Sequence, residues 1–240
     1  MPNIPSVGAL LHGNRYPGRG IAVGKSPSGR FAAVAYFIMG RSENSRNRVF
    51  VKTSDGIRTQ AFDPEKMRDA RLIIYSPVRR AGNHLIVANG DQSDTIASAL
   101  KSGGSFEDAL RTRAFEPDAP HFTPRISALL TTENDDFFYQ MSILKSADET
   151  GSACARYFFD VPALAGEGRL IHTYEHDGDV LPSFSGEPRR VAIPEDVDEW
   201  TNEIWSGLDP DNRISLFTRY LDLKTGEQTD RIVNKNEEDA

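Results

Sequence analysis

Two apolar runs at residues 19–26 and 30–39 are separated only by Pro27-Ser28-Gly29, and this spacing is the strongest constraint on the fold. Pro and Gly favour the dihedral angles of a tight turn, so the two runs are expected to pair as an antiparallel hairpin. A parallel pair would instead need a long crossover connection between its strands. The spacing therefore favours a mostly antiparallel architecture.

The remainder of the chain favours an α+β fold. Apolar, β-branched and aromatic segments predict further strands at residues 48–53, 70–76, 84–89, 126–131, 137–144, 153–161, 169–176 and 214–223. Helices are expected from Asp94 to about Lys101, from Ser105, and from Pro194 through Trp205. Because these helices come in groups and do not alternate strictly with strands, layered α+β packing is favoured over a doubly wound parallel sheet.

Length and composition favour a single cytoplasmic domain. The 240 residues contain no internal repeat and no low-complexity linker, so residues 1–240 are expected to form one domain. The one cysteine, Cys154, excludes an intrachain disulfide and fits a reducing compartment. No basic segment precedes an apolar run at the N-terminus, and no run approaches a membrane span. We therefore expect no membrane partner.

The net charge of −7 argues against general nucleic-acid binding, which depends on a basic face. An anionic ligand would have to be met by local clusters of cations. Arg41, Arg46 and Arg48 form one such cluster in the polar segment 40–47 and just after it, and Arg79-Arg80 form another. The alternative is that these arginines only solvate the surface.

The segment from Asn83 to Ile96 runs from an apolar strand through small polar residues into a helix. Such a junction directs unpaired backbone N–H groups outward, and Gly90 would let a ligand approach the main chain. The segment is therefore a candidate site for a polar, phosphorylated small molecule. Its polar residues could instead serve only to cap the helix.

The sequence lacks the residues that several classes of catalytic site require. His172 and His176 share a face of a strand, but no third ligand follows at metal-site spacing. Cys154 lies in an apolar strand, and neither a nucleophile elbow nor a phosphate-binding glycine motif is present. No metal, cofactor or covalent intermediate is therefore expected.

What remains is a set of arginines, amides, carboxylates and hydroxyls. These side chains are suited to binding a phosphate and to forming hydrogen bonds with amide and ribose groups. The members of this set are Arg41, Ser42, Asn47, Arg48, Asn89, Asp91, Ser93, Asp94, Thr95, Thr123 and Arg125.

Six short motifs carry a resemblance to a known family. They are Gly18-Arg19-Gly20-Ile21-Ala22-Val23-Gly24, Gly40-Arg41-Ser42 leading to Asn47-Arg48, Tyr75, Asn89-Gly90 leading to Asp94-Thr95-Ile96, Thr123-Pro124-Arg125-Ile126, and Thr173-Tyr174-Glu175. In this order and approximate spacing the chain resembles the archaeal-type inosine monophosphate (IMP) cyclohydrolase family and its bacterial relatives. The resemblance implies a four-layer αββα sandwich similar to N-terminal-nucleophile hydrolases, without their processed nucleophile. Residues 1–17 and the hairpin and tail at 207–240 extend beyond the compact archaeal pattern.

The resemblance also implies an activity in purine biosynthesis. In that reaction the carboxamide nitrogen of 5-formamidoimidazole-4-carboxamide ribotide attacks the formyl carbon, and water is lost as the ring of IMP closes. Both reacting groups belong to one molecule, so orientation and electrostatics can replace a metal or a nucleophile. Arg48 matches the family arginine expected to orient the substrate and stabilise the oxyanion. Tyr75 matches the family tyrosine expected to position the formyl group or relay a proton.

The acid that the family places shortly before Thr-Pro-Arg-Ile is out of register here, and Glu116, Asp118 and His121 are all candidates for the base. Two alternatives to the enzyme follow. One is a purine-nucleotide-binding module without catalysis, and the other is an amidohydrolase acting on a different formamide or lactam. The long apolar strands could also support a homo-oligomer.

Overall fold

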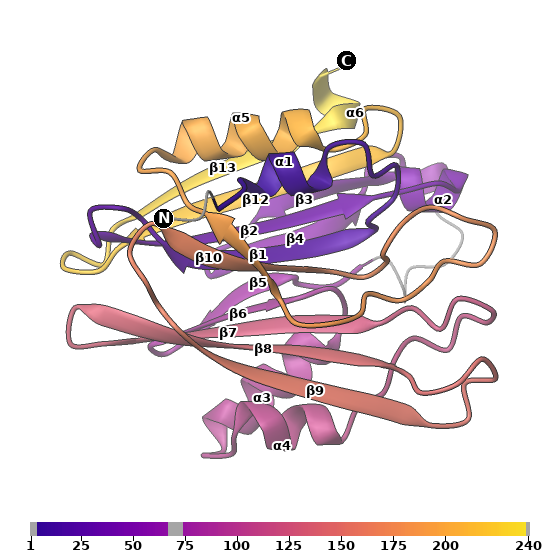
Figure 1. The fold of residues 1–240 in the computed structure, drawn as a ribbon, viewed down its shortest axis with the longest axis horizontal. Coiled ribbons are helices and arrows are strands. Elements are labelled where there is room, and N and C mark those ends of the chain that lie inside the picture. The colour runs from indigo at the N-terminus through magenta and orange to yellow at the C-terminus, as the bar shows by residue number, and fades with distance from the viewer. Residues whose placement is uncertain (1–3, 67–73, 239–240) are drawn as a thin grey trace.

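A computed structural model describes residues 4–66 and 74–238 and shows two β-sheets stacked face to face (Figure 1). In spatial order, the first sheet holds β11 (Arg189–Ala192), β10 (Glu167–His172), β1 (Arg19–Lys25), β2 (Phe31–Met39), β12 (Arg213–Asp222) and β13 (Gln228–Asn234). The second holds β3 (Arg48–Lys52), β4 (Gly56–Ala61), β5 (Val78–Ala81), β6 (His84–Ala88), β7 (Arg125–Glu133), β8 (Asp136–Ser146) and β9 (Cys154–Pro162). Neighbouring strands in both sheets are antiparallel, which confirms the predicted fold class.

The predicted hairpin is confirmed as β1 and β2. Gly29 takes a left-handed φ of 76°, and Lys25 lies opposite Ala32 where the strands leave the turn. Almost every residue of β2 is buried, because both faces of this strand are covered. Its even-numbered residues, such as Tyr36, face the second sheet, whereas its odd-numbered residues, such as Phe37, face a helix layer.

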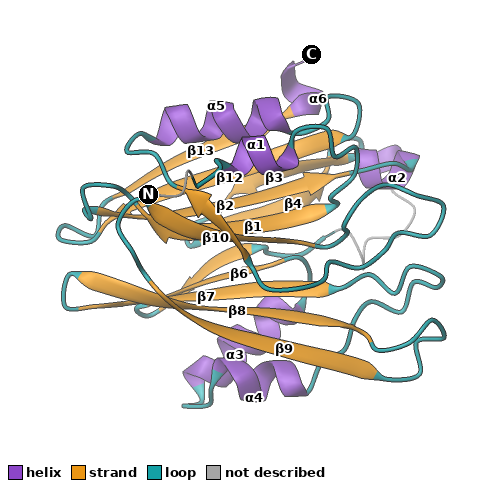
Figure 2. Cartoon of the chain, viewed as in Figure 1, coloured by secondary structure: helices purple, strands orange, loops and turns teal. Residues whose placement is uncertain are grey.

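Helices cover the outer faces of both sheets, giving four layers (Figure 2). On the first sheet, α1 (Val7–Leu11) and α5 (Val197–Gly207) pack against an apolar cluster from β1, β2, β10 and β12. On the second sheet, α3 (Gln92–Lys101) and α4 (Phe106–Arg111) pack against β6, β7 and β8. The third and largest cluster fills the space between the sheets.

Several elements differ from the predictions. Residues 70–73 of the strand predicted at 70–76 lie outside the described residues, and residues 74–76 are not in a strand. β4 and β5 were missed because they are short and only half-buried, so the apolar pattern is weak. The helix predicted from Pro194 begins at Val197, because the Asp196 side chain accepts hydrogen bonds from the backbone N–H groups of Asp198 and Glu199.

Short elements complete the chain. The predicted polar loop at residues 40–47 contains the one-turn helix α2 (Glu43–Arg46), which Ser42 caps. A single turn (Pro64–Lys66) follows β4, β11 was not predicted, and α6 (Lys235–Glu238) ends the described chain. No helix in the described ranges is both long enough and apolar enough to cross a membrane.

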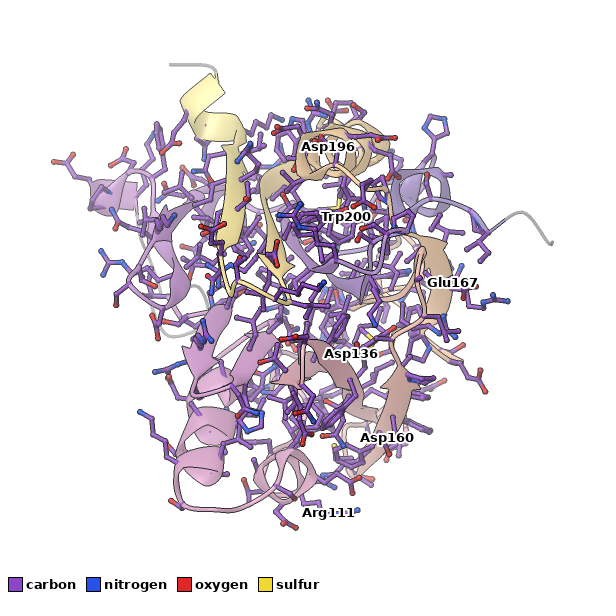
Figure 3. The ribbon with its side chains drawn as sticks, turned by 90° about the vertical axis from the view of Figure 1, so that its left-hand side faces the viewer. Arg111, Asp136, Asp160, Glu167, Asp196 and Trp200 are labelled. Atoms are coloured by element: carbon purple, nitrogen blue, oxygen red, sulfur yellow. The ribbon has the colours of Figure 1, made fainter. Side chains whose placement is uncertain are left out.

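Trp200 is the largest fully buried side chain, and it lies on the side of α5 that faces the first sheet (Figure 3). We expect Trp200→Ala to lower the free energy of unfolding by roughly 3–5 kcal/mol, because the sheet cannot close around the lost volume. Urea unfolding followed by circular dichroism would measure this loss. Asn202→Ala, at an exposed position of the same helix, is the matched control and should change stability by less than about 0.5 kcal/mol. A loss below about 1 kcal/mol at Trp200 would contradict the packing of α5 described here.

Candidate functional site

A polar cavity of about 240 Å³ lies where β1 begins, β2 ends and β3 begins. Its walls also include the segment before β7 and the segment after β10, so residues far apart in sequence meet there. The lining residues are Tyr16, Gly18, Arg19, Met39, Ser42, Asn44, Ser45, Arg48, Glu116, Asp118, Thr123 and Tyr174. This volume is slightly below the roughly 300 Å³ at which small-molecule sites begin.

Arg48 is a buried cation in the cavity wall, only 4% exposed. Its Nε donates to the carbonyl of Ser45 at 2.8 Å, and its Nη2 donates to the carbonyl of Met39 at 3.0 Å. Within the described part of the chain no carboxylate lies within ion-pair distance of Arg48. A buried guanidinium held by neutral acceptors attracts a negatively charged group in the cavity.

Arg19 and Glu116 form a buried ion pair in the same wall. Arg19 Nη1 lies 2.9 Å from Glu116 Oε1, and Arg19 Nη2 lies 3.1 Å from Oε2. Arg19 Nη1 also donates to the backbone carbonyl of Asn89 at 2.9 Å. Burial alone would lower the pKa of Arg19, but the charge and hydrogen bond of Glu116, together with Tyr75 and Tyr174, more than offset it, and the pKa is raised well above its usual value. The pair therefore places a fixed cation beside a carboxylate.

Tyr75 lies behind this wall in the core between the sheets. Its hydroxyl and that of Tyr36 are 2.7 Å apart, and its backbone N–H donates to Thr59 Oγ1 at 2.9 Å. Burial and the neighbouring Tyr75 raise the pKa of Tyr36, while Arg19 and Arg48 oppose part of that shift. The phenol of Tyr36 is therefore protonated at neutral pH, and it lies close to both guanidinium groups.

The part of the lining next to Glu116 is built around Thr123, whose carbonyl accepts from the Glu116 N–H at 2.9 Å and whose hydroxyl bonds to Asp118 and to the hydroxyl of Tyr174. The Thr123 backbone N–H also donates to Asp118 Oδ1 at 2.7 Å. The ring of Tyr174 stacks on Tyr16, with centroids 5.9 Å apart, and burial raises the pKa of Tyr174. The guanidinium of Arg41 lies 4.9 Å from the Tyr16 ring centroid. The lining of the site therefore places arginines and carboxylates next to hydroxyls and aromatic rings.

Arg41 itself is partly exposed at the edge of this wall. It pairs with Asp177 at 2.7 Å and donates to the carbonyl of Gly178 at 2.8 Å. Its neighbour Ser42 lines the cavity and caps α2.

The polar segment after β6 forms an internal network. The side-chain oxygen of Asn89 accepts from Gln92 Nε2 at 2.8 Å and from the Ile126 N–H at 3.0 Å. Arg125 bonds to Gln92 at 2.6 Å and pairs with Asp91 at 2.8 Å. A Cβ on Gly90 would lie 2.6 Å from the Arg125 guanidinium, so close side-chain packing explains this glycine. The network meets the cavity through the Asn89 carbonyl that Arg19 contacts.

Burial would raise the pKa of Asp91, but hydrogen bonds and charge from Arg113 and Arg125 lower it. Asp91 is the N-cap residue of α3, although its side chain makes no capping hydrogen bond. Its carboxylate is held by the two arginines instead.

The other candidate residues point elsewhere. Asn47 exchanges two 2.7 Å hydrogen bonds with the backbone of Asp63. Asp94 pairs with Arg79, and Thr95 accepts a 3.4 Å hydrogen bond from Arg113. The buried hydroxyl of Ser93 has no partner among the described residues. The structure thus brings Arg48, Ser42 and Thr123 together in the cavity wall, with Arg41 at its edge.

Of the three candidate bases, Glu116 and Asp118 line the cavity, whereas His121 lines a separate groove with Phe122 and Leu181. The Nδ1 atom of His121 accepts from the Leu181 N–H at 3.2 Å. Glu116 and Asp118 therefore have the placement that proton transfer in this cavity would need.

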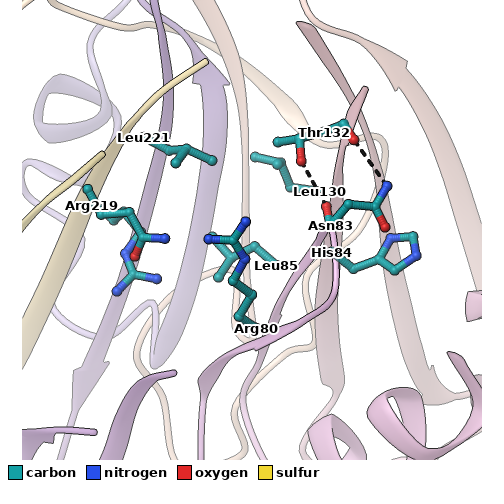
Figure 4. A pocket seen from close by; sticks show the side chains of 9 residues that line it. Arg80, Asn83, His84, Leu85, Leu130, Thr132, Arg219 and Leu221 are labelled. Atoms are coloured by element: carbon teal, nitrogen blue, oxygen red, sulfur yellow. Dashed lines mark hydrogen bonds between the residues drawn. The ribbon is translucent and has the colours of Figure 1, made fainter. Parts of the chain in front are cut away.

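A second opening between the sheets is lined by Arg80, Arg219 and Leu221, among others (Figure 4). Its volume of about 10 Å³ admits no more than one water molecule. In residues 4–66 and 74–238, no group of three His, Cys, Asp or Glu side chains is arranged to hold a metal ion.

Sequence reasoning gave no site role to Arg19, Tyr16 or Tyr174. The usable signal for Arg19 was its position between two glycines at the start of an apolar strand. Gly18 has a φ of 80°, and a Cβ on Gly20 would lie 2.1 Å from the Phe37 ring. The glycines therefore let the strand start close to its neighbours, and this brings Arg19 into the interior.

Comparison with known proteins shows which sequences this chain is similar to. A family model described as IMP cyclohydrolase-like protein matches residues 16–228. An IMP cyclohydrolase of Methanopyrus kandleri is 30% identical over 201 residues, covering 78% of this chain and 98% of that protein. The IMP cyclohydrolase of Methanococcus aeolicus is 31% identical over 48% of this chain and 58% of its own length. The IMP cyclohydrolase of Halobacterium salinarum is 27% identical, and the match covers 63% of this chain and 77% of that protein.

His172 fixes the backbone beside Tyr174. Its Nδ1–H donates to the Tyr174 carbonyl at 2.8 Å, and its ring meets Phe184 edge-on, with centroids 4.7 Å apart. Burial lowers the pKa of His172 to about 4 from the ordinary value of 6.5. Between these two pH values the unfolded chain binds a proton that the folded chain does not, so stability falls as the pH falls from 6.5 to 4.

We expect this histidine to lower the free energy of unfolding by about 2 kcal/mol between pH 7 and pH 5. Urea unfolding at both pH values would measure the difference. His172→Asn keeps a donor for the Tyr174 carbonyl but does not titrate in this range, so its stability should depend less steeply on pH. An equal pH dependence in both proteins would refute the assignment.

Proposed function

Because this chain belongs to the IMP cyclohydrolase-like family, we propose that it converts 5-formamidoimidazole-4-carboxamide ribotide to IMP with loss of water. The observation that carries the proposal is the pairing, in one cavity, of a buried Arg48, which has no carboxylate partner among residues 4–66 and 74–238, and a buried Arg19–Glu116 pair. Together they offer a donor for a developing oxyanion and an acceptor for a proton.

The reaction begins when the carboxamide nitrogen attacks the formyl carbon. A C–N bond forms, the nitrogen gives up one proton, and negative charge grows on the formyl oxygen. Arg48 stabilises that oxygen, since only two of its N–H groups are engaged by the backbone acceptors described above. Because the donor is already held in place by Ser45 and Met39, it needs no rearrangement as the charge develops.

Glu116 accepts the proton from the carboxamide nitrogen, and Arg19 keeps this carboxylate oriented. In the second half of the reaction Glu116 returns this proton to the former formyl oxygen, and the proton of the formamide nitrogen supplies the second one. The C–O bond then breaks as the C=N bond of the ring forms, and water leaves. Asp118 is the alternative acceptor; its two oxygens accept from Thr123, as those of Glu116 accept from Arg19. We assign the base to Glu116, and substitution of each carboxylate decides between the two.

The remaining candidates hold the substrate or the walls. Ser42 and Arg41 bind the ribose-phosphate end at the edge of the cavity, and Thr123 contacts the ribotide from its position next to Glu116. Tyr75 acts as a positioning residue, because its hydroxyl bonds to Tyr36 beside the two guanidinium groups. Asn89 acts indirectly, through the carbonyl that holds Arg19.

Arg48→Ala should lower kcat/KM for formation of IMP by about 10²–10³, the usual effect of losing one transition-state donor. The increase in ultraviolet absorbance as the purine ring closes provides the assay. Arg58→Ala removes an exposed arginine from β4 and is the control, expected to retain activity within about twofold. A loss smaller than tenfold at Arg48 would exclude the oxyanion role.

Glu116→Gln keeps an oxygen acceptor for Arg19 but removes the base, so kcat should fall by about 10²–10⁴. Urea unfolding of the variant is the control, because a purely structural role would lower its stability together with its activity. Asp118→Asn should have the smaller effect of the two. If the two effects are reversed, Asp118 is the base.

Turnover and binding assays with the wild-type protein distinguish the enzyme from the alternative functions. Turnover of the formylated ribotide supports the enzyme. Binding of IMP by calorimetry without turnover would replace the enzyme with a nucleotide-binding module. The absence of both turnover and IMP binding would direct the search to another formamide or lactam.

A further inference from the structure

The two sheets have four edge strands, and three of them are covered. The N-terminal segment lies along β11, where the Ala192 N–H donates to the Pro5 carbonyl at 2.9 Å. β3 and β13 lie against each other, because Asn234 bonds through its side chain to both the N–H and the carbonyl of Phe50, at 2.8 and 3.0 Å. Covering an edge in this way blocks pairing with another chain.

The fourth edge strand, β9, is open. In the ranges that the structure describes, its main chain pairs only with β8. The strand is nine residues long and lies at the margin of the second sheet (Figure 2). Tyr157, on its inner face, is 46% exposed. An uncovered strand of this length is a template for another strand.

The charges on β9 suit pairing with a second copy of itself. Phe158 is the middle residue of the strand, and Arg156 and Asp160 lie two residues to either side, both exposed and on the same face. A two-fold axis through the middle of an antiparallel pair places Arg156 opposite Asp160 of the partner subunit, and this happens twice. Like charges at these two positions would repel each other, whereas an arginine opposite an aspartate is attractive.

The neighbouring contacts agree with this register. In the same register, Tyr157 lies opposite Phe159 of the partner subunit, so its exposed ring gains an aromatic neighbour. Asp160, labelled in Figure 3, has one oxygen bonded to Gln140 at 2.8 Å, which leaves the other for an arginine. Arg156 donates to the carbonyls of Arg113 and Cys154 through three of its five N–H groups, which leaves two for that oxygen. Shifting the register by one residue in either copy would move apolar residues to the wrong face, and shifting it by two would separate the charges.

From these observations we propose that two copies of the chain join through antiparallel pairing of their β9 strands, which makes one continuous sheet across the dimer. Arg156 and Asp160 fix the register of this interface.

Sedimentation velocity over a dilution series tests the proposal with the full chain. The wild-type protein should dimerise. Arg156→Glu and Asp160→Arg should each raise the dimer dissociation constant by about tenfold or more, because each replaces two attractive pairs with two repulsive ones. Wild type that stays monomeric, or a dimer that neither substitution weakens, would overturn the proposal.

Mixing the two single variants excludes misfolding as the cause. A mixture of Arg156→Glu and Asp160→Arg chains restores attraction at both positions, so it should form a heterodimer although neither variant dimerises well alone. The double reversal Arg156→Asp/Asp160→Arg should likewise dimerise near the wild-type level. Arg58→Glu and Glu187→Arg make the same changes in net charge at exposed positions away from β9 and should leave the dissociation constant unchanged. Failure of the mixture to associate would reject the assigned register.

Discussion

The buried ion pair of Arg19 and Glu116 is the interaction on which the arrangement of the cavity depends. Arg19 comes from the first strand of the first sheet, whereas Glu116 and the Asn89 carbonyl belong to segments that flank strands of the second. A charge taken out of water must find its partners in the protein, and removing either partner leaves a buried charge without compensation. The pair therefore ties the two sheets together beside the ligand cavity and fixes their relative position there.

The same constraint explains why the base and the oxyanion donor can share one small space. Arg48 is held by the carbonyls of Ser45 and Met39 and so keeps its full positive field, while the charge of Arg19 is matched by Glu116. If Glu116 faced Arg48 directly, the two would neutralise each other, and less of the field would reach a substrate. Separating the roles between two arginines lets one cavity hold both an electrophilic and a basic group.

The sequence predicted the parts of this molecule that local chemistry determines. Pro27-Ser28-Gly29 specified the first hairpin, and Ser105 specified the start of α4, because turns and caps depend on neighbouring residues alone. Arg48 and Thr123 were singled out as polar residues next to apolar strands, and both line the cavity. The Arg19–Glu116 pair spans 97 positions and exists only because the sheets stack, so no local pattern could reveal it. The network around Asn89 looked like a ligand site for a related reason: from sequence, an amide that binds its own protein resembles one that binds a nucleotide.

The order of strands also has a consequence for how the chain is assembled on the ribosome. β3 to β9 are consecutive in both sequence and space, so the second sheet can form hairpin by hairpin as it emerges. The first sheet cannot, because β1 pairs with β10, and β2 pairs with β12 near the other end of the chain. Closing such long loops is slow, and the first hairpin must wait for most of the polypeptide to be synthesised. The cavity is therefore among the last features of the nascent protein to mature.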